Sequence, residues 1–319
     1  MTDEVKFSLV GKRVWVAGHR GMVGSALLRR LERENCTILT AKRRELDLTD
    51  QTSTRKWLRD HRPDAIFVAA AKVGGIVANT RFPAEFLYEN LIIGANIIDA
   101  AYRTSTAKLL YLGSSCIYPK ASAQPIEESA LLAGPLEPTN EWYAIAKISG
   151  LKLCEAYRIQ FGADFVSAMP SNLYGPGDNF GLETSHVIPG LMRKAHEAKI
   201  RKLQELVVWG SGTPRREFLH VDDCADALVR VMTHYSENEH INVGSGKDIA
   251  IAELAALVAH VVGFKGELVY DSSKPDGTPR KLMSPKKMRT LGWTPRISLS
   301  DGLAEVYASY LRHTASQSA

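Results

Sequence analysis

Cysteine is scarce in this chain. Only four of the 319 residues are cysteines, at Cys36, Cys116, Cys154 and Cys224. They lie far apart and form neither a Cys-x-x-Cys pair nor a cysteine/histidine pattern, which argues against a disulfide framework and against a zinc site. We therefore expect no bound metal, and reduced thiols of the kind that persist in the cytoplasm.

Long runs of apolar residues and long runs of basic residues are also missing. No apolar run is long enough to cross a bilayer, and the first residues, MTDEVKFSLVGKR, include acids and lack an apolar signal core. The formal net charge is only +5, and the basic residues form no long run with interleaved aromatics. We expect a cytoplasmic protein that binds neither membranes nor nucleic acid, although its charge permits an anionic small ligand.

The composition that remains is that of an ordinary globular protein, with 45% hydrophobic and 24% charged residues. A chain of 319 residues exceeds the roughly 250 at which a single core stops growing. This length predicts one large unit with a smaller lobe.

A strand, a glycine turn and a helix are predicted near the start. The apolar run Arg13–Ala17 leads into GHRGMVG, and the helix-like SALLRRLERE follows. Bare backbone at such a turn lets a pyrophosphate approach the positive end of the helix, although a tight turn without a ligand is the alternative. The spacing is GxxGxxG and departs from the dinucleotide fingerprint GxGxxG. The candidate cofactor-binding residues here are Gly18, Arg20, Gly21, Met22, Val23 and Gly24.

The next two strands supply the adenosine side of the predicted cofactor site. After the strand Thr37–Thr40 comes AKRRE, where Arg43 lies among three cations. An acid is usual here for NAD, whereas a basic cluster suits the 2′-phosphate of NADP, so we favour NADP over NAD and over a solvated surface turn. Asp47 and the residue after it could cap the adenine. The third strand, 64–71, ends in small residues that include Ala70, where a cofactor lies in open α/β sheets.

A tyrosine and a lysine four residues apart are the candidate catalytic pair. Tyr143 and Lys147 fall on one face of a helix predicted over about 140–161, and a nearby ammonium should lower the phenol pKa. By itself this pair is common on protein surfaces. However, Ser114 follows the strand Leu109–Leu112, so its hydroxyl should meet the same crevice. Cys116 would share that pocket if the chain stays extended, because residues i and i+2 of a strand point the same way.

The strand and helix patterns together predict an α/β protein: a Rossmann doubly wound parallel sheet with a smaller C-terminal α/β substrate-binding lobe. We assign 1–176 and parts of about 220–245 to the NADP-binding domain, and 177–319 to the interleaved lobe. We place the segments IAELAALVAHVVG and KKMRTLGW with the lobe. We read His19, His220 and the other unassigned histidines as structural.

Several motifs together resemble a known family. GxxGxxG, GSSCIYP, Tyr-x-x-x-Lys and PSNLYGP are similar to the extended short-chain dehydrogenase/reductases that act on nucleotide sugars. More narrowly, GHRGMVGSA, AAAKVGGIVAN, EPTNEWYAIAKI, SHVIP and KPDGTPRKL resemble the GDP-L-fucose synthase family. This resemblance implies an NADPH-dependent epimerase and reductase of GDP-4-keto-6-deoxy-D-mannose. It also implies a homodimer in which the helices near 83–103 and 140–161 form a four-helix bundle with their mates; burial against the sheet is the alternative.

The resemblance also implies roles for single residues. Ser114, Tyr143 and Lys147 match the catalytic triad of the superfamily, while Cys116 and His186 match the pair that epimerises C3 and C5. His186, Asn172 and Leu173 match cofactor-binding positions. The substrate-binding positions are Lys194, Trp209, Arg216 and Lys281. Lys194 stands where the family has an arginine, and lysine lacks the planar fork that binds a phosphate with two hydrogen bonds, although Arg193 precedes it.

The chemistry of a 4-keto sugar agrees with this assignment. Protons on C3 and C5 are acidified because the carbanion delocalises into an enolate, and a single pair of donors at the 4-oxygen serves both epimerisations and the reduction. Three alternatives remain at this point: a GDP-sugar 4-epimerase, a colitose-type synthase that epimerises only C5, and a non-catalytic NADP-binding regulator.

Overall fold

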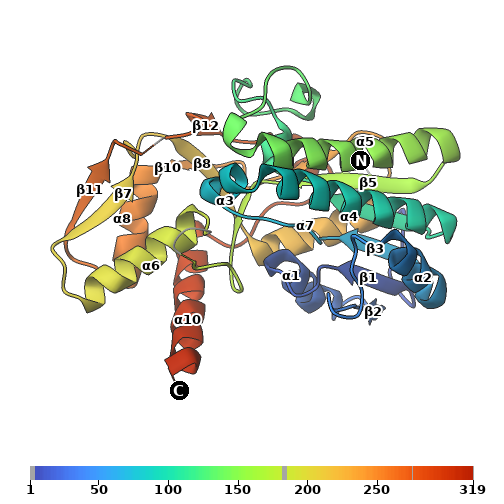
Figure 1. The fold of residues 1–319 in the computed structure, drawn as a ribbon, viewed down its shortest axis with the longest axis horizontal. Helices are drawn as coiled ribbons and strands as arrows, with labels where there is room; N and C mark the ends of the chain where they lie inside the picture. The colour runs from blue at the N-terminus through green and yellow to red at the C-terminus, as the bar shows by residue number, and fades with distance from the viewer. Residues whose placement is uncertain (1–3, 182–184, 275, 319) are drawn as a thin grey trace.

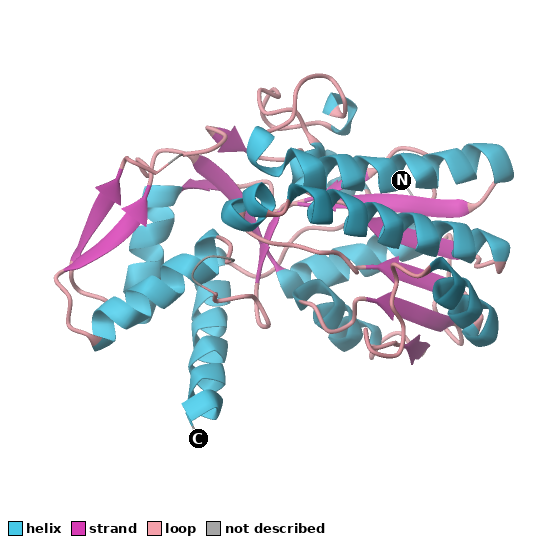
Figure 2. Cartoon of the chain, viewed as in Figure 1, coloured by secondary structure: helices cyan, strands magenta, loops and turns pink. Residues whose placement is uncertain are grey.

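The computed structural model describes residues 4–181, 185–274 and 276–318. Its centre is a parallel sheet of six strands in the order β2-β1-β3-β4-β5-β9 (Figures 1 and 2). Four of the strands overlap the strands predicted at 13–17, 37–40, 64–71 and 109–112. The six strands are β1 (Arg13–Ala17), β2 (Thr37–Leu39), β3 (Ala65–Val68), β4 (Lys108–Leu112), β5 (Asp164–Pro170) and β9 (Ile241–Val243).

Helices cover both faces of this sheet, so the predicted doubly wound fold is confirmed. Along β1, Val14 and Val16 point to one core and Trp15 and Ala17 to the other. The first core is closed by α1 (Met22–Leu31) and α7 (Val221–His234). The second core is closed by α2 (Gln51–His61), α4 (Pro83–Arg103) and α5 (Glu141–Phe161).

A smaller lobe has a separate apolar core. Its helices are α6 (Val187–Ile200), α8 (Ile251–Val262) and α10 (Leu299–Ser318), and its two paired strands are β7 (Glu205–Trp209) and β11 (Glu267–Asp271). The last of these helices projects from the body of the molecule (Figure 1).

A second sheet contributes residues to the candidate substrate site. Its central strand, β8 (Arg215–His220), pairs in parallel with β6 (Asn172–Tyr174) and β12 (Arg280–Lys281), and antiparallel with β10 (Asp248–Ala250). The register sets Lys281 opposite Arg216. Two candidate substrate-binding cations, distant in sequence, therefore lie side by side.

Two short helices complete the fold: α3 (Ile76–Arg81) and α9 (Lys286–Thr290). The placement of KKMRTLGW in the smaller lobe was wrong. Met288 and Trp293 are buried in the core shared by α1 and α7, and the Trp293 indole N–H donates to Asp226 at 3.0 Å. An amphipathic segment packs wherever an apolar face is left open, and its sequence does not specify which of two cores it joins.

The glycine turn after β1 is built on two close backbone approaches. Gly18 has φ +86°, and a Cβ there would lie 2.6 Å from the backbone nitrogen of Ala70. A Cβ on Gly24 would lie 2.1 Å from the Gly18 carbonyl oxygen, whereas one on Gly21 would meet nothing nearer than 3.5 Å. The turn therefore requires glycine at the first and third positions for packing, and the second is sterically open.

This difference predicts the effects of two matched substitutions. Gly24→Ala should lower the free energy of unfolding by about 3 kcal/mol or more, because backbone must move to admit the methyl group. Gly21→Ala should change it by no more than about 1 kcal/mol, because its φ of −75° suits alanine. Urea denaturation of both variants measures the effect, and equal losses would contradict this account of the turn.

Candidate active site

A cavity lies at the carboxyl ends of β1, β2 and β3. Its volume is about 620 Å³, within the usual range for small-molecule sites. The chain runs from β1 to β2 on one side and returns to β3 on the other, and such a reversal is where open α/β sheets bind ligands. Five predicted cofactor residues line it: Gly18, Arg20, Gly21, Arg43 and Ala70.

Other residues of the predicted cofactor set are placed differently. The partly buried side chains of Met22 and Val23 pack against the core beside α1, and neither residue lines the cavity. Gly24 allows the close backbone packing of the glycine turn. Arg44, one of the three predicted cations, does not line the cavity and instead lies 3.8 Å from Glu45, whereas Lys42 and Arg43 do line it.

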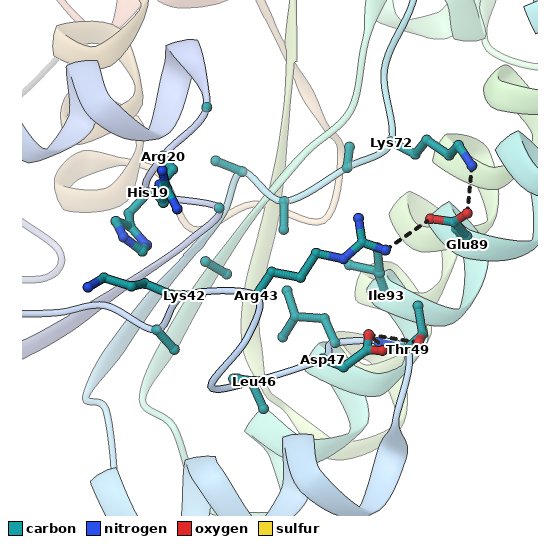
Figure 3. A pocket seen from close by; sticks show the side chains of 18 of the residues that line it. His19, Arg20, Lys42, Arg43, Leu46, Asp47, Thr49, Lys72, Glu89 and Ile93 are labelled. Atoms are coloured by element: carbon teal, nitrogen blue, oxygen red, sulfur yellow. Dashed lines mark hydrogen bonds and ion pairs between the residues drawn. The ribbon is translucent and has the colours of Figure 1, made fainter. Parts of the chain in front are cut away.

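Several lining residues were missed or misread from the sequence. His19, read as structural, lines the cavity, and burial together with the charge of Arg20 lowers its pKa. Its place within the glycine turn was the available signal. Glu89 was missed and lines the cavity, as does Lys72, which lies in the loop after the predicted third strand (Figure 3). No sequence pattern ties Glu89, on α4, to this site.

Two buried asparagines of α4 hold the rim of the cavity. Asn90 accepts a hydrogen bond from the Lys72 backbone N–H at 2.8 Å and donates to the Lys72 carbonyl at 3.0 Å. Asn96 donates to the carbonyls of Leu48 and Thr49 at 2.9 and 3.1 Å. These polar positions in an otherwise apolar helix satisfy backbone groups of two cavity-lining segments.

The segment after β4 turns where an extended chain was expected. Ser114 caps a 3₁₀ helix, Ser115–Ile117, and its Oγ accepts a hydrogen bond from the Cys116 N–H at 3.4 Å. The alternation argument for Cys116 was therefore wrong, but the serine and the buried cysteine remain neighbours through this cap.

Lys147 is buried and bonded to the end of β4. Its Nζ donates to the Leu112 carbonyl at 2.8 Å and lies 5.7 Å from the centre of the Tyr143 ring. Burial lowers the pKa of Lys147 to about 8. Burial also raises the pKa of Tyr143, and the neighbouring Cys116 and Tyr111 raise it further, so the expected lowering was wrong. Tyr143 is therefore a protonated donor at neutral pH.

Cys116 lies among several charged or ionisable groups. Burial raises its pKa, while the charge of Lys281, the hydrogen bond with Ser114 and the charge of Lys147 oppose that rise. Cys116 and Lys281 also line one small cavity with Asn140, whose buried Oδ1 has no hydrogen-bond partner. The structure thus gathers Ser114, Tyr143, Lys147 and Lys281 around the thiol of Cys116.

The predicted substrate residues fall into two groups. Arg216 and Lys281 lie opposite each other in the second sheet, and burial lowers the pKa of each. In the lobe, the Lys194 ammonium lies 4.3 Å from the centre of the half-exposed Trp209 ring. Arg193 bonds to Glu197 and to the Phe180 carbonyl.

His186, Asn172 and Leu173 lie outside this cluster. His186 is the exposed residue before α6, and desolvation by the surrounding protein lowers its pKa. The Asn172 amide donates to the Glu217 carbonyl at 2.8 Å, and Leu173 packs against the core beside α7. In the part of the chain that the structure describes, none of these side chains hydrogen-bonds to the cluster, so their roles stay predictions.

Within 4–181, 185–274 and 276–318, no group of three or more His, Cys, Asp or Glu residues is arranged to hold a metal ion. Among those same residues, no helix combines the length and apolar character needed to cross a membrane.

Comparison with known proteins shows the family to which the chain belongs. Residues 14–244 match the model of the NAD dependent epimerase/dehydratase family. The chain is 60% identical over 309 residues to a GDP-L-fucose synthase from Sinorhizobium fredii, covering 97% of this chain and 98% of that protein. It is 38% identical to a GDP-L-colitose synthase from Yersinia pseudotuberculosis, covering 94% and 98%. A solved GDP-L-fucose synthetase from Naegleria fowleri bound to NADP superposes with a TM-score of 0.88 at 28% identity, covering 98% and 99%. The chain therefore belongs to the NAD dependent epimerase/dehydratase family and, within it, to the GDP-L-fucose synthase family.

Proposed function

We propose that this chain converts GDP-4-keto-6-deoxy-D-mannose to GDP-L-fucose, epimerising C3 and C5 and then reducing the 4-keto group with NADPH. The observation that carries the proposal is a buried thiol beside both a tyrosine–lysine pair and a cation of the second sheet. A simple reductase needs the pair alone. The thiol adds a group that can exchange protons on carbon.

The cavity at β1, β2 and β3 fits NADP. Its volume suits a nucleotide, its glycine turn leaves backbone open to a pyrophosphate, and Arg20, Lys42 and Arg43 supply positive charge for the 2′-phosphate. When bound, NADPH supplies the hydride for the reduction. Lys147 additionally holds the nicotinamide ribose, and Asn172 and Leu173 orient the nicotinamide.

Side chains of the protein carry out the proton transfers. Ser114 and Tyr143 donate hydrogen bonds to the 4-oxygen, which stabilises the enolate formed when a proton leaves C3 or C5. Cys116 and His186 act on opposite faces of the sugar, one removing a proton and the other delivering one. Tyr143, with its raised pKa, then protonates the 4-oxygen during reduction.

The GDP part of the substrate is bound away from the reacting carbons and positions the sugar. Arg216 and Lys281 bind the diphosphate through charge-assisted hydrogen bonds, and Trp209 stacks on the guanine. Lys194 adds a point charge in place of an arginine fork. Lys281 also faces Cys116, so its charge favours the thiolate at the moment when the sugar is bound.

The alternatives are less well supported. The colitose synthase is only 38% identical, against 60% for the fucose synthase. A regulator that merely binds NADP has no use for a thiol held beside two buried lysines.

The reaction is tested with purified protein, NADPH and GDP-4-keto-6-deoxy-D-mannose, reading NADPH oxidation and identifying the sugar by NMR. Wild type should yield GDP-L-fucose. Cys116→Ser should cut formation of the epimerised sugar, and deuterium uptake at C3 and C5 from D₂O, by about 100-fold or more, because a hydroxyl is a far weaker base. NADPH binding should be unchanged.

Cys36→Ser is the matched control, because this thiol lies before β2 and bonds only weakly to the Leu31 carbonyl. It should epimerise like wild type. Normal epimerisation by Cys116→Ser would remove the thiol from the mechanism, and absence of turnover in wild type would favour the regulator.

We also propose that the protein is a cytoplasmic homodimer. Helices α4 and α5 lie side by side on the outside of the molecule (Figure 1). They expose large apolar side chains: Tyr88, Leu91, Tyr102, Trp142, Ile159 and Phe161. A two-fold mate would cover this surface as a four-helix bundle.

Ile159→Glu should shift the dimer toward monomer, because Ile159 is 74% exposed within this surface. Sedimentation velocity measures the shift. Val10→Glu, at a 65% exposed position before β1, should leave the dimer intact. A wild-type protein that sediments as a monomer at micromolar concentration would refute the proposal.

A further inference from the structure

Two acidic side chains, Asp47 and Glu89, lie in the wall of a cavity that is otherwise basic, and Asp47 accepts hydrogen bonds from the Thr49 N–H and hydroxyl. Glu89, on α4, lines the cofactor cavity together with Arg20, Lys42, Arg43 and Lys72. Its Oε1 is 2.6 Å from the Lys72 Nζ, and its Oε2 is 3.9 Å from an Arg43 terminal nitrogen. Figure 3 shows Arg43 and Lys72 both directed toward this one carboxylate.

Lys72 is held in this arrangement by its backbone and by a second acid. Asn90 bonds to both its N–H and its carbonyl, which fixes where the side chain begins. The ammonium also pairs with Glu85, which does not line the cavity. The charge of Lys72 is therefore neutralised by two carboxylates, Glu85 and Glu89.

Arg43 is held much more loosely. Its side chain is 84% exposed, and a pair at 3.9 Å between exposed groups contributes little. A phosphate dianion can displace such a pairing. The Glu89 carboxylate is anchored by Lys72, however, so it repels a phosphate that Arg43 binds beside it.

We infer that Glu89 sets the cofactor preference of this chain by weakening its affinity for nucleotides that carry a 2′-phosphate. The inference rests on the proposed use of NADPH and concerns the adenosine half of its site. Glu89 opposes the basic cluster, so binding of the phosphorylated cofactor is weaker than Arg20, Lys42 and Arg43 alone would give.

Isothermal titration of the full chain with 2′,5′-ADP and with 5′-AMP tests this without any catalytic step. Glu89→Gln should tighten binding of 2′,5′-ADP by about three- to tenfold, because repulsion is removed and Lys72 is partly freed. Binding of 5′-AMP should change by less than about twofold, because it lacks the second phosphate. The matched control, Glu85→Gln, removes the same charge and also pairs with Lys72, and it should change both affinities by less than about twofold.

Three outcomes would overturn the inference: unchanged or weaker 2′,5′-ADP binding in Glu89→Gln, an equal gain in Glu85→Gln, or an equal gain for 5′-AMP. Failure of wild type to bind 2′,5′-ADP, NADPH and NADP at all would instead refute the proposed cofactor, and with it this inference. Thermal melting of each variant confirms that the fold is retained.

Discussion

The hydrogen bond from the buried Lys147 ammonium to the Leu112 carbonyl is the interaction on which the candidate active site depends. A buried charge is costly unless it is paired, and this carbonyl lies at the end of the central strand β4. The bond therefore fixes α5 against the turn that carries Ser114 and Cys116. Tyr143, one helical turn before Lys147, is brought to the same place by the same contact.

Burial then sets the protonation of this cluster. It raises the pKa of Tyr143 and Cys116 and lowers that of Lys147 and Lys281. A neutral phenol suits donation to a ketone oxygen, whereas the thiol must ionise to act as a base. The Lys281 ammonium is the main electrostatic neighbour of the thiol. One enclosed site can in this way both remove protons from carbon and deliver them to oxygen.

Local patterns predicted the elements well but not every contact between them. The apolar run of β1, the glycines after it and the cations near Arg43 are contiguous in sequence, so the cofactor cavity could be foreseen. Glu89 reaches that cavity through the packing of α4, and Lys281 meets Arg216 only through strand register. The placement of Met288 and the direction of the Tyr143 pKa shift were predicted wrongly, because both depend on burial that a linear sequence does not specify.

The most direct measurement is a crystal structure of this chain with its oxidised cofactor and GDP-4-keto-6-deoxy-D-mannose bound. The account predicts the Tyr143 and Ser114 hydroxyls within about 3 Å of the sugar 4-oxygen, and the Cys116 sulfur facing C3 or C5 on the side of the ring opposite His186. A sugar ring bound away from these hydroxyls, or a sulfur turned away from the sugar, would contradict it.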